Sequence, residues 1–526
     1  MNTLIAEMPV YASTLDTEFV DLPSRIRALA AEAPDQPAVI DDTGSWSRSA
    51  LLAQSHRVAN RLIACGLQRG DTVAVLASNS RDYVALMIGT LAAGGCFVPL
   101  SSMATGHALA LMIEDCDTRF IFCDPEYTEG LPRLTNVPAE HHVLMQDRAE
   151  NWHALSDWLG DISSAAPDVT LSEDDAFNII YSSGTTGRPK GIVHDHRLRS
   201  YQHARFVKMG FAPGCITLIA TPIYSNTTMV GLLPTLFEGG LLVLMRKFNA
   251  AGYLALAAQY RVTHTIMIPV QYQRILSEPT FDSTDLSSFK LKVSSGAPLR
   301  AHVIKDLVAR WPGTLLEVYG MTEGGGSTVL NCTAFPDKWD SVGRAGEGTT
   351  LHVIDEQGKV LPPNTPGELV GHGSIMMRGY YKRPEQSREM LWHDDQGRVF
   401  YRTGDMARID EDGFIYLLDR RKDMILSGGF NIFAEDLEKV LSSHELVTDV
   451  AVIAVPSDAW GETPLGLVVL KAGAQMEADA LRAWANERLG KTQRLSAIEF
   501  REELPRNPLG KIMKRELRAP YWPAQQ

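Results

Sequence analysis

Residues 181–191 read Tyr181-Ser182-Ser183-Gly184-Thr185-Thr186-Gly187-Arg188-Pro189-Lys190-Gly191. They follow Ala176-Phe177-Asn178-Ile179-Ile180, a short apolar run that predicts a buried strand. Hydroxyl side chains alternate with glycines, which let the backbone turn tightly and bring its N–H groups close to a ligand. Arg188 and Lys190 add positive charge. The combination predicts a loop that cradles a polyphosphate.

This loop is not a Walker A loop. Only two residues separate Gly184 from Gly187, and Gly191 follows Lys190 where a Walker A loop has Ser or Thr. A flexible polar loop is the alternative for a run of this composition. The full string closely resembles the phosphate-binding signature of the adenylate-forming superfamily, which comprises acyl- and aryl-CoA synthetases, adenylation domains of peptide synthetases, and luciferases. The resemblance implies that the nucleotide is bound by Ser182, Ser183, Gly184, Thr185, Thr186, Gly187 and Lys190, with Thr186 and Lys190 also catalytic.

The composition is that of a large globular enzyme with several domains. The chain has 526 residues, of which 45% are apolar and 21% charged. The formal net charge of -13 argues against nucleic acid or an acidic membrane surface as a partner. The six cysteines form no CxxC pair, and the N-terminus lacks a basic, apolar leader, so we expect a cytoplasmic protein. The apolar segment from Val84 to Leu100 is interrupted by glycines and predicts a buried helix and strand, with no membrane span.

Predicted strands and helices alternate through the first two thirds of the chain. A helix at residues 49–65, a strand at 72–76, a helix at 81–93 and a strand at 96–100 set a rhythm typical of a parallel sheet with helices on its faces. The organisation changes after Asp405. The resemblance implies an α/β fold, with a large N-terminal domain (1–419) of parallel-type sheets flanked by helices and a small, mobile α+β C-terminal domain (420–526).

A second motif follows the predicted strand at residues 315–318. Ligands gather at strand ends in open α/β sheets, and Glu323 beside a phosphate site is costly unless a cation such as Mg²⁺ intervenes. A solvated loop acid is the alternative. The segment Tyr319-Gly320-Met321-Thr322-Glu323 resembles the superfamily's Tyr-Gly-x-Thr-Glu motif. By that resemblance Tyr319 and Gly320 lie at the adenine, Thr322 contacts phosphate, and Glu323 is catalytic and holds Mg²⁺.

Three further segments resemble nucleotide contacts of the superfamily. Gly296 and Ala297, after the strand ending at Ser295, match the wall of the adenine site, although such a turn alone is more often only a turn. Asp405, in Tyr401-Arg402-Thr403-Gly404-Asp405, matches the acid that accepts from both ribose hydroxyls, with a turn-capping role as the alternative. Arg420 matches a nucleotide-contacting arginine.

The C-terminal residues matter only through the resemblance. A lysine on a loop rich in Pro and Gly is ordinarily solvated. Lys511, in Leu509-Gly510-Lys511, matches the lysine that steadies the charge developing between the carboxylate and the α-phosphate. Lys422 matches a hinge residue about which the small domain rotates between two half-reactions, and Gly428 and Gly429 match the segment lining the pantetheine tunnel.

The acyl pocket is the least determined part of the prediction. Tyr224, Ser225 and Gly324 are candidates for its wall, and Ser225 stands where relatives often carry His or an aromatic gate. The small side chains hint at an aromatic or otherwise bulky acid. The cluster His194-Asp195-His196 with His203 suggests a metal site, but its spacing places the histidines on different faces of a helix, so we interpret it as a solvated helix start.

The resemblance implies a ligase that uses ATP, Mg²⁺ and coenzyme A. A small carboxylic acid, aromatic or of medium size, attacks the α-phosphate of MgATP, and the acyl-adenylate then passes to the thiol of CoA with release of AMP and pyrophosphate. Transfer to a carrier-protein phosphopantetheine thiol, a luciferase-like oxidase, and a non-catalytic nucleotide-binding protein are the alternatives. The acid and the oligomeric state stay open, with a homodimer as one alternative.

Overall fold

The computed structural model describes residues 18–131, 134, 136–182, 189–420, 423–427, 430–490, 493–507 and 510–522. The chain divides into two compact units. The first comprises Met1–Trp339, Gly346–Thr350 and His372–Tyr401. The second comprises Asp340–Ala345, Leu351–Gly371 and Arg402–Gln526. The expected domain boundary at 419/420 falls inside the second unit and stays a prediction.

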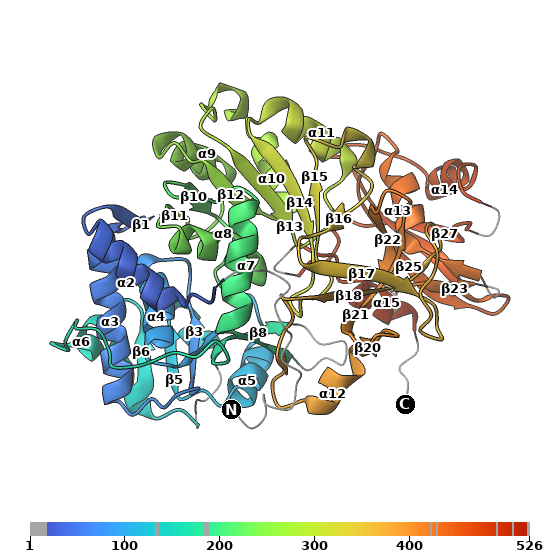
Figure 1. Ribbon diagram of the computed structural model, residues 1–526. Helices are drawn as coiled ribbons and strands as arrows, with labels where there is room; N and C mark the ends of the chain where they lie inside the picture. Colours follow the sequence, from blue (N-terminus) through green and yellow to red (C-terminus); the bar gives the residue numbers. More distant parts are fainter. Residues whose placement is uncertain are drawn as a thin grey trace. The chain divides into compact units, whose positions relative to one another are not determined.

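One sheet of the first unit has the strand order β15-β14-β13-β12-β10-β11-β1-β2 (Figure 1). The pairs from β14 across to β1 are parallel, and the two outermost pairs, β14 with β15 and β1 with β2, are antiparallel. Because the inner strands run the same way, their carboxyl ends share one edge. The strands are β1 (Pro37–Asp41), β2 (Gly44–Ser47), β10 (Ile216–Ile219), β11 (Leu241–Leu244), β12 (His264–Met267), β13 (Leu291–Ser295), β14 (Thr314–Tyr319) and β15 (Thr328–Asn331).

A second sheet of the first unit has the order β19-β9-β8-β4-β3-β5-β6-β7. Its strands from β8 to β7 pair in parallel, whereas β9 is antiparallel to both β8 and β19. The predicted phosphate-binding stretch spans the end of β8 and the start of β9. The strands are β3 (Thr72–Leu76), β4 (Cys96–Pro99), β5 (Phe120–Cys123), β6 (His142–Leu144), β7 (His153–Ala154), β8 (Ala176–Ser182), β9 (Lys190–Asp195) and β19 (Gly379–Tyr380).

Helices connect the parallel strands and cover the sheets. The helix α4 is apolar on every side and almost wholly buried, as expected for a helix within a core. It approaches α3 closely at Gly89, where a Cβ atom would lie 2.6 Å from the Val58 side chain, so only glycine fits there. The helices are α2 (Leu22–Glu32), α3 (Arg48–Ala64), α4 (Arg81–Ala92), α5 (Gly106–Asp115), α6 (Leu155–Leu159), α7 (His196–Lys208), α8 (Asn226–Phe237), α9 (Ala250–Gln259), α10 (Pro269–Leu276), α11 (Ala301–Arg310) and α12 (Pro384–Glu389).

The second unit is a smaller α+β structure with its own apolar core. Its longest pairing joins β25 and β26 in an antiparallel hairpin. The strand β23 pairs with the start of β26, and β27 pairs in parallel with the middle and end of β26. The end of β21 pairs with β22, with Asp405 opposite Arg420. The core packs α13 and α14 against these strands. The elements are β22 (Ile415–Arg420), β23 (Ile425–Ser427), β24 (Phe430–Ile432), α13 (Ala434–Ser442), β25 (Val447–Ser457), β26 (Gly461–Leu470), α14 (Ala478–Asn486), β27 (Ala497–Phe500) and α15 (Lys514–Arg518).

The remaining strands belong to residues 340–409, a part of the sequence in which the chain alternates between the two units. They are β16 (Arg344–Ala345), β17 (Thr349–Ile354), β18 (Gly367–Gly373), β20 (Leu391–His393) and β21 (Val399–Ile409).

The predicted α/β fold is confirmed. The predicted strands and helices occur within a few residues of the expected ends, and the segment from Val84 to Leu100 is a buried helix and strand. The antiparallel strands β9 and β15 were not predicted. They are short and partly polar, so periodicity alone does not separate them from loops. Every helix in the described part of the chain is too short or too polar to span a membrane.

Candidate active site

The predicted adenine residues lie at the carboxyl ends of two neighbouring strands. Gly296 and Ala297 follow β13, and Tyr319 ends β14, with Ser295 opposite Val318 in the parallel register. The Ser295 hydroxyl donates to the Val318 carbonyl at 2.8 Å, which ties the two strand ends together. The structure therefore brings these predicted residues to one edge of the sheet.

The turn at Gly296 adopts a backbone that favours glycine, with φ at +91°. A Cβ atom there would lie 3.4 Å from Ile268 and 3.5 Å from the Thr227 hydroxyl oxygen. Thr227 belongs to the first turn of α8, which begins directly after the predicted acyl-pocket residues Tyr224 and Ser225. The predicted adenine wall and the predicted acyl wall are therefore adjacent.

The loop after β14 is held against the segment that leads into β19. The Met377 N–H donates to the Glu323 carbonyl at 2.8 Å, and the Gly325 N–H donates to the Ile375 carbonyl at 2.8 Å. Gly324 has φ at +78°, and a Cβ there would lie 2.1 Å from the Ile375 carbonyl oxygen. This close backbone contact requires glycine at position 324. The sequence had predicted Gly324 for a different reason, as part of the acyl-pocket wall.

The side chain of Glu323 is oriented by Tyr380, a residue that the sequence analysis missed. The Tyr380 hydroxyl donates to Glu323 Oε1 at 2.8 Å, and the Lys190 ammonium lies 4.9 Å from the centre of the Tyr380 ring. One aromatic side chain thus links the predicted Mg²⁺ ligand to the predicted phosphate lysine. No local pattern marks Tyr380, because it stands 57 residues from Glu323 in the sequence.

The site fits a divalent cation shared with phosphate oxygens. The described residues contain no group of three His, Cys, Asp or Glu side chains that would hold a metal by themselves. Glu323 accepts a hydrogen bond at Oε1, while the described residues offer no donor to Oε2. A carboxylate oxygen of this kind suits Mg²⁺, which binds through one or two carboxylates plus substrate phosphates.

The phosphate-binding stretch is described only at its two ends. Ser182 ends β8 and lies opposite Lys190 at the start of β9. The predicted residues Ser183, Gly184, Thr185, Thr186 and Gly187 lie outside the described residues. The hairpin fixes where the stretch begins and ends.

The interpretation of the histidine cluster as a solvated helix start is wrong. His194 and His196 are 1% and 2% exposed, and Asp195 is the N-cap of α7, where it accepts from the Leu198 N–H at 2.8 Å. The segment is buried because it passes from the buried strand β9 directly into α7. His203 contacts Glu238 instead of the other histidines.

His194 reaches the predicted Mg²⁺ loop. Its Nε2 lies 2.7 Å from the Thr322 carbonyl oxygen, which only accepts, so Nε2 carries the proton. Its Nδ1 faces the Asn178 amide at 3.1 Å and the Arg199 guanidinium at 2.9 Å. Burial and the nearby guanidinium lower the pKa of His194 well below its usual value. A neutral histidine therefore supports the backbone one residue before Glu323.

The predicted acyl residues Tyr224 and Ser225 are both buried. The Ser225 hydroxyl accepts from the Thr227 N–H at 3.2 Å. Ser225 is therefore the N-cap of α8, a position that favours a short hydroxyl side chain. Burial raises the pKa of Tyr224. Both residues directly precede α8, whose Thr227 lies near the adenine turn at Gly296, and their contact with an acid stays a prediction.

A buried carboxyl lies behind the predicted adenine site. Glu317, in β14, is 5% exposed and accepts from the Leu299 N–H at 2.9 Å. Burial raises the pKa of Glu317 to about 8. The side chain is therefore protonated near neutral pH.

The remaining predicted residues belong to the second unit. Asp405 is 6% exposed, and its N–H donates to the Thr403 hydroxyl at 3.1 Å. Both residues lie within β21, on either side of Gly404, whose φ is +69°. Arg420 lies opposite Asp405 in the β21–β22 pairing.

Lys511 lies on an exposed loop of the second unit, and Asn507 holds its backbone. The Lys511 N–H donates to Asn507 Oδ1 at 2.9 Å, and the Asn507 N–H donates to the Lys511 carbonyl at 2.8 Å. The predicted hinge residue Lys422 and the predicted CoA residues Gly428 and Gly429 lie outside the described residues.

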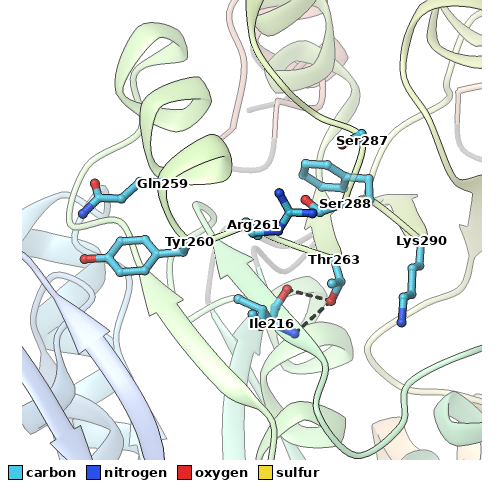
Figure 2. A pocket seen from close by; sticks show the side chains of 9 residues that line it. Ile216, Gln259, Tyr260, Arg261, Thr263, Ser287, Ser288 and Lys290 are labelled. Carbon is cyan, nitrogen blue, oxygen red and sulfur yellow. Dashed lines mark hydrogen bonds between the residues drawn. The ribbon is translucent and has the colours of Figure 1, made fainter.

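A separate pocket lies at the opposite edge of the first sheet. Figure 2 shows Ile216, Thr263 and Lys290 around it, each at the start of a strand or just before one. The Thr263 hydroxyl accepts from the Ile216 N–H at 2.8 Å and donates to its carbonyl at 3.1 Å, so it joins β10 to the chain entering β12. None of the predicted site residues lines this pocket.

Comparison with known proteins identifies the family. The model for AMP-binding enzymes matches residues 26–381, and the model for their C-terminal domain matches residues 436–511. The chain is 32% identical to a feruloyl-CoA synthase of an Amycolatopsis species, over 93% of this chain and 96% of the relative. It is 29% identical to the fatty acid–[acyl-carrier-protein] ligase ScoC of Streptomyces coeruleorubidus, over 94% of this chain and 95% of the relative.

A solved structure agrees over nearly the whole chain. The crystal structure of ATP-bound MatB from Rhodopseudomonas palustris superposes with a TM-score of 0.85 at 30% identity, covering 95% of this chain and 99% of that one. These matches confirm the superfamily predicted from the motifs. The chain therefore belongs to the AMP-binding enzyme family and is an ATP-dependent, AMP-forming ligase of the acyl-CoA synthetase type.

Proposed function

We propose that this enzyme adenylates an aromatic or medium-sized carboxylic acid with MgATP and transfers the acyl group to CoA. The acid's carboxylate oxygen attacks the α-phosphorus, the bond to the β-phosphate oxygen breaks, and pyrophosphate leaves. The CoA thiolate then attacks the acyl carbon of the adenylate and expels AMP. The similarity to feruloyl-CoA synthase supports both steps and an acid of this size.

One observation carries the proposal: Glu323, Tyr380 and Lys190 form a linked group beside the carboxyl ends of β13 and β14. Adenylation joins two anions, so the site must neutralise and align them. Lys190 would neutralise phosphate charge at the end of the phosphate stretch, and Glu323 would hold Mg²⁺. The metal, when bound, supplies charge neutralisation between the phosphate oxygens.

The other residues take roles that the family resemblance assigns. Thr186 and its neighbours in the phosphate stretch would bind the β- and γ-phosphates, Tyr319 would lie against the adenine, and Asp405 would accept from the ribose hydroxyls. Lys511 would steady the charge at the reacting oxygens during adenylation. Domain rotation at Lys422 would then replace Lys511 by the CoA-binding segment at Gly428 and Gly429.

A carrier-protein thiol is the second candidate acceptor. The similarity to an acyl-carrier-protein ligase favours it, since that relative covers as much of the chain as the CoA ligase does. The two candidates share the first half-reaction and differ only in the acceptor.

The test is pyrophosphate release with MgATP across a panel of aromatic and aliphatic acids, with and without CoA, followed by mass spectrometry. We expect release with at least one acid and a mass increase of the acid's acyl group on CoA. Adenylate that forms without a CoA product would move the proposal to a carrier protein. Absence of release with every acid would refute the enzyme and leave a nucleotide-binding protein.

We also propose a cytoplasmic location, which is supported by six cysteines that are all free thiols. A homodimer stays a prediction.

A further inference from the structure

The loop that carries Lys511 is held at its base by the core of the second unit. Leu504, which precedes the loop, is 5% exposed, and Ile512, which follows it, packs against the same apolar cluster on β25 and β26. The two ends of the loop lie side by side, since the Met513 N–H donates to the Pro505 carbonyl at 2.8 Å. Lys511 lies beyond these anchors, in the polar part of the loop.

Arg506 joins this polar part of the loop to β25. Its Nη1 donates to the Gly510 carbonyl at 2.5 Å, and its Nη2 donates to Asp449 Oδ2 at 2.5 Å. The Gly510 carbonyl shares a planar peptide unit with the Lys511 N–H, which donates to Asn507 Oδ1 at 2.9 Å. Side chains of two consecutive residues therefore hold both polar groups of the peptide unit that leads into Lys511.

Gly510 lets the loop turn but does not by itself fix the direction in which Lys511 leaves the loop. Its φ is +76°, a conformation that favours glycine. Glycine also has more backbone freedom than any other residue, so ordering it costs the most conformational entropy. The two side-chain hydrogen bonds to the peptide unit between Gly510 and Lys511 therefore restrict a rotation that the chain alone leaves open.

Asp449 gives Arg506 a rigid point of attachment. It lies in β25, two residues before Ala451 and four before Ile453, so the three side chains lie on one face of the strand. Ala451 and Ile453 belong to the apolar cluster against which the base of the loop packs. Arg506 thus ties the peptide unit before Lys511 to a strand in the core of the second unit.

We propose that Arg506, anchored by Asp449, is a positioning residue for adenylation, and that it acts by holding the Gly510 carbonyl and so the direction of Lys511. The inference rests on the proposed function, in which Lys511 steadies the charge at the reacting oxygens. A positioned charge loses much of its catalytic effect when it is displaced. Arg506 should therefore matter for adenylation and not for thioester formation, for which the CoA-binding segment replaces Lys511.

The test measures the two half-reactions separately, with whichever acid of the aromatic and aliphatic panel the wild type adenylates fastest. Adenylation is followed as pyrophosphate release, with kcat and KM for MgATP determined separately. Thioester formation is followed by mass spectrometry of the product formed from CoA and the synthetic acyl-adenylate of the same acid. Arg506→Met removes both hydrogen bonds of the guanidinium and keeps a long, unbranched side chain.

The expected effect of Arg506→Met is a selective loss of adenylation. The Arg506 and Asp449 side chains are 35% and 28% exposed, so water screens part of their interaction. For a charge-assisted clamp of this kind we expect kcat for adenylation to fall about 3- to 30-fold, with KM for MgATP and the rate of thioester formation each changed by less than about twofold.

Arg501→Met is the matched control. Arg501 pairs with Glu499 at 2.6 Å in the same unit, and the two side chains are 37% and 39% exposed, so a similar ion pair is lost away from the Lys511 loop. This variant should leave both half-reactions unchanged. Asp449→Ala should slow adenylation selectively, and the double variant with Arg506→Met should be no slower than Arg506→Met alone, because Asp449 acts through Arg506.

Several results would overturn the inference. One is unchanged adenylation in Arg506→Met, and another is an equal loss of both half-reactions, which indicates a structural role in the second unit. Losses that multiply in the double variant would show that Asp449 does not act through Arg506. Should Arg506→Met fail to fold, Asp449→Ala keeps the test, since its own ratio of the two half-reactions must then shift.

Lys511→Ala, measured in parallel, separates this inference from the proposed function. Unchanged adenylation in Lys511→Ala refutes the role that the proposed function gives to the lysine. A strong loss of adenylation in Lys511→Ala, together with wild-type adenylation in Arg506→Met, leaves the proposed function intact and refutes only the positioning role of Arg506.

Discussion

The hydroxyl of Tyr380 offers a direct test of the arrangement around Glu323. Tyr380→Phe removes the 2.8 Å hydrogen bond to Glu323 and keeps the ring over which Lys190 lies at 4.9 Å. Tyr380 is 7% exposed, so water does not readily replace the lost donor. A hydrogen bond to a charged group contributes about 1.5–3 kcal/mol. At about 1.4 kcal/mol for each factor of ten, we expect kcat/KM for MgATP to fall about 10- to 150-fold.

The assay is pyrophosphate release at a fixed acid concentration, titrated with MgATP and, separately, with Mg²⁺. The loss should appear as a higher Mg²⁺ concentration for half-maximal activity, because the hydroxyl orients the carboxylate that would hold the metal. Tyr381→Phe is the matched control, since the Tyr381 hydroxyl donates to Asp117 at 3.2 Å and does not touch Glu323. Wild-type kinetics for Tyr380→Phe, or equal losses in both variants, would refute the reasoning.

Three further predictions concern the half-reactions, the buried carboxyl and the loop after β14. Lys511→Ala should slow adenylation about a hundredfold or more while sparing thioester formation from supplied acyl-adenylate, and Lys422→Pro should do the reverse; equal loss of both half-reactions in both variants would count against domain rotation. The folded-state pKa of Glu317 is about 8 against an ordinary 4.5, so the folded state keeps a proton that the unfolded state releases. Stability should therefore fall as pH rises from about 4.5 to about 8, and Glu317→Gln should flatten that fall in urea unfolding at several pH values. Gly324→Ala places a Cβ 2.1 Å from the Ile375 carbonyl oxygen, so it should impair adenylation, and an unchanged rate and melting temperature would contradict this contact.

Local sequence patterns predicted most of the first unit correctly. The alternation of apolar runs and helical spacing gave β3, α4 and β4 within a residue or two, because each side chain's exposure there follows the element's own period. The short antiparallel strands β9 and β15 escaped, since their pairing depends on neighbours far along the chain. Helix capping also explains Ser225, because its hydroxyl accepts a backbone hydrogen bond in the first turn of α8. The sequence analysis considered only the small size of this side chain.

The sequence by itself determined the family and the order of the site motifs, because the phosphate stretch and the Tyr-Gly-x-Thr-Glu segment are contiguous strings whose chemistry is local. Only the tertiary structure decided which side chains meet. Tyr380 reaches Glu323 from 57 residues away, and His194 reaches Thr322 from 128 residues away. The same holds for Arg199, which reads as one more polar residue on a helix. It is buried only because β8 and α8 pack around it, where the side-chain oxygens of Asn178 and Asn226 accept from its guanidinium.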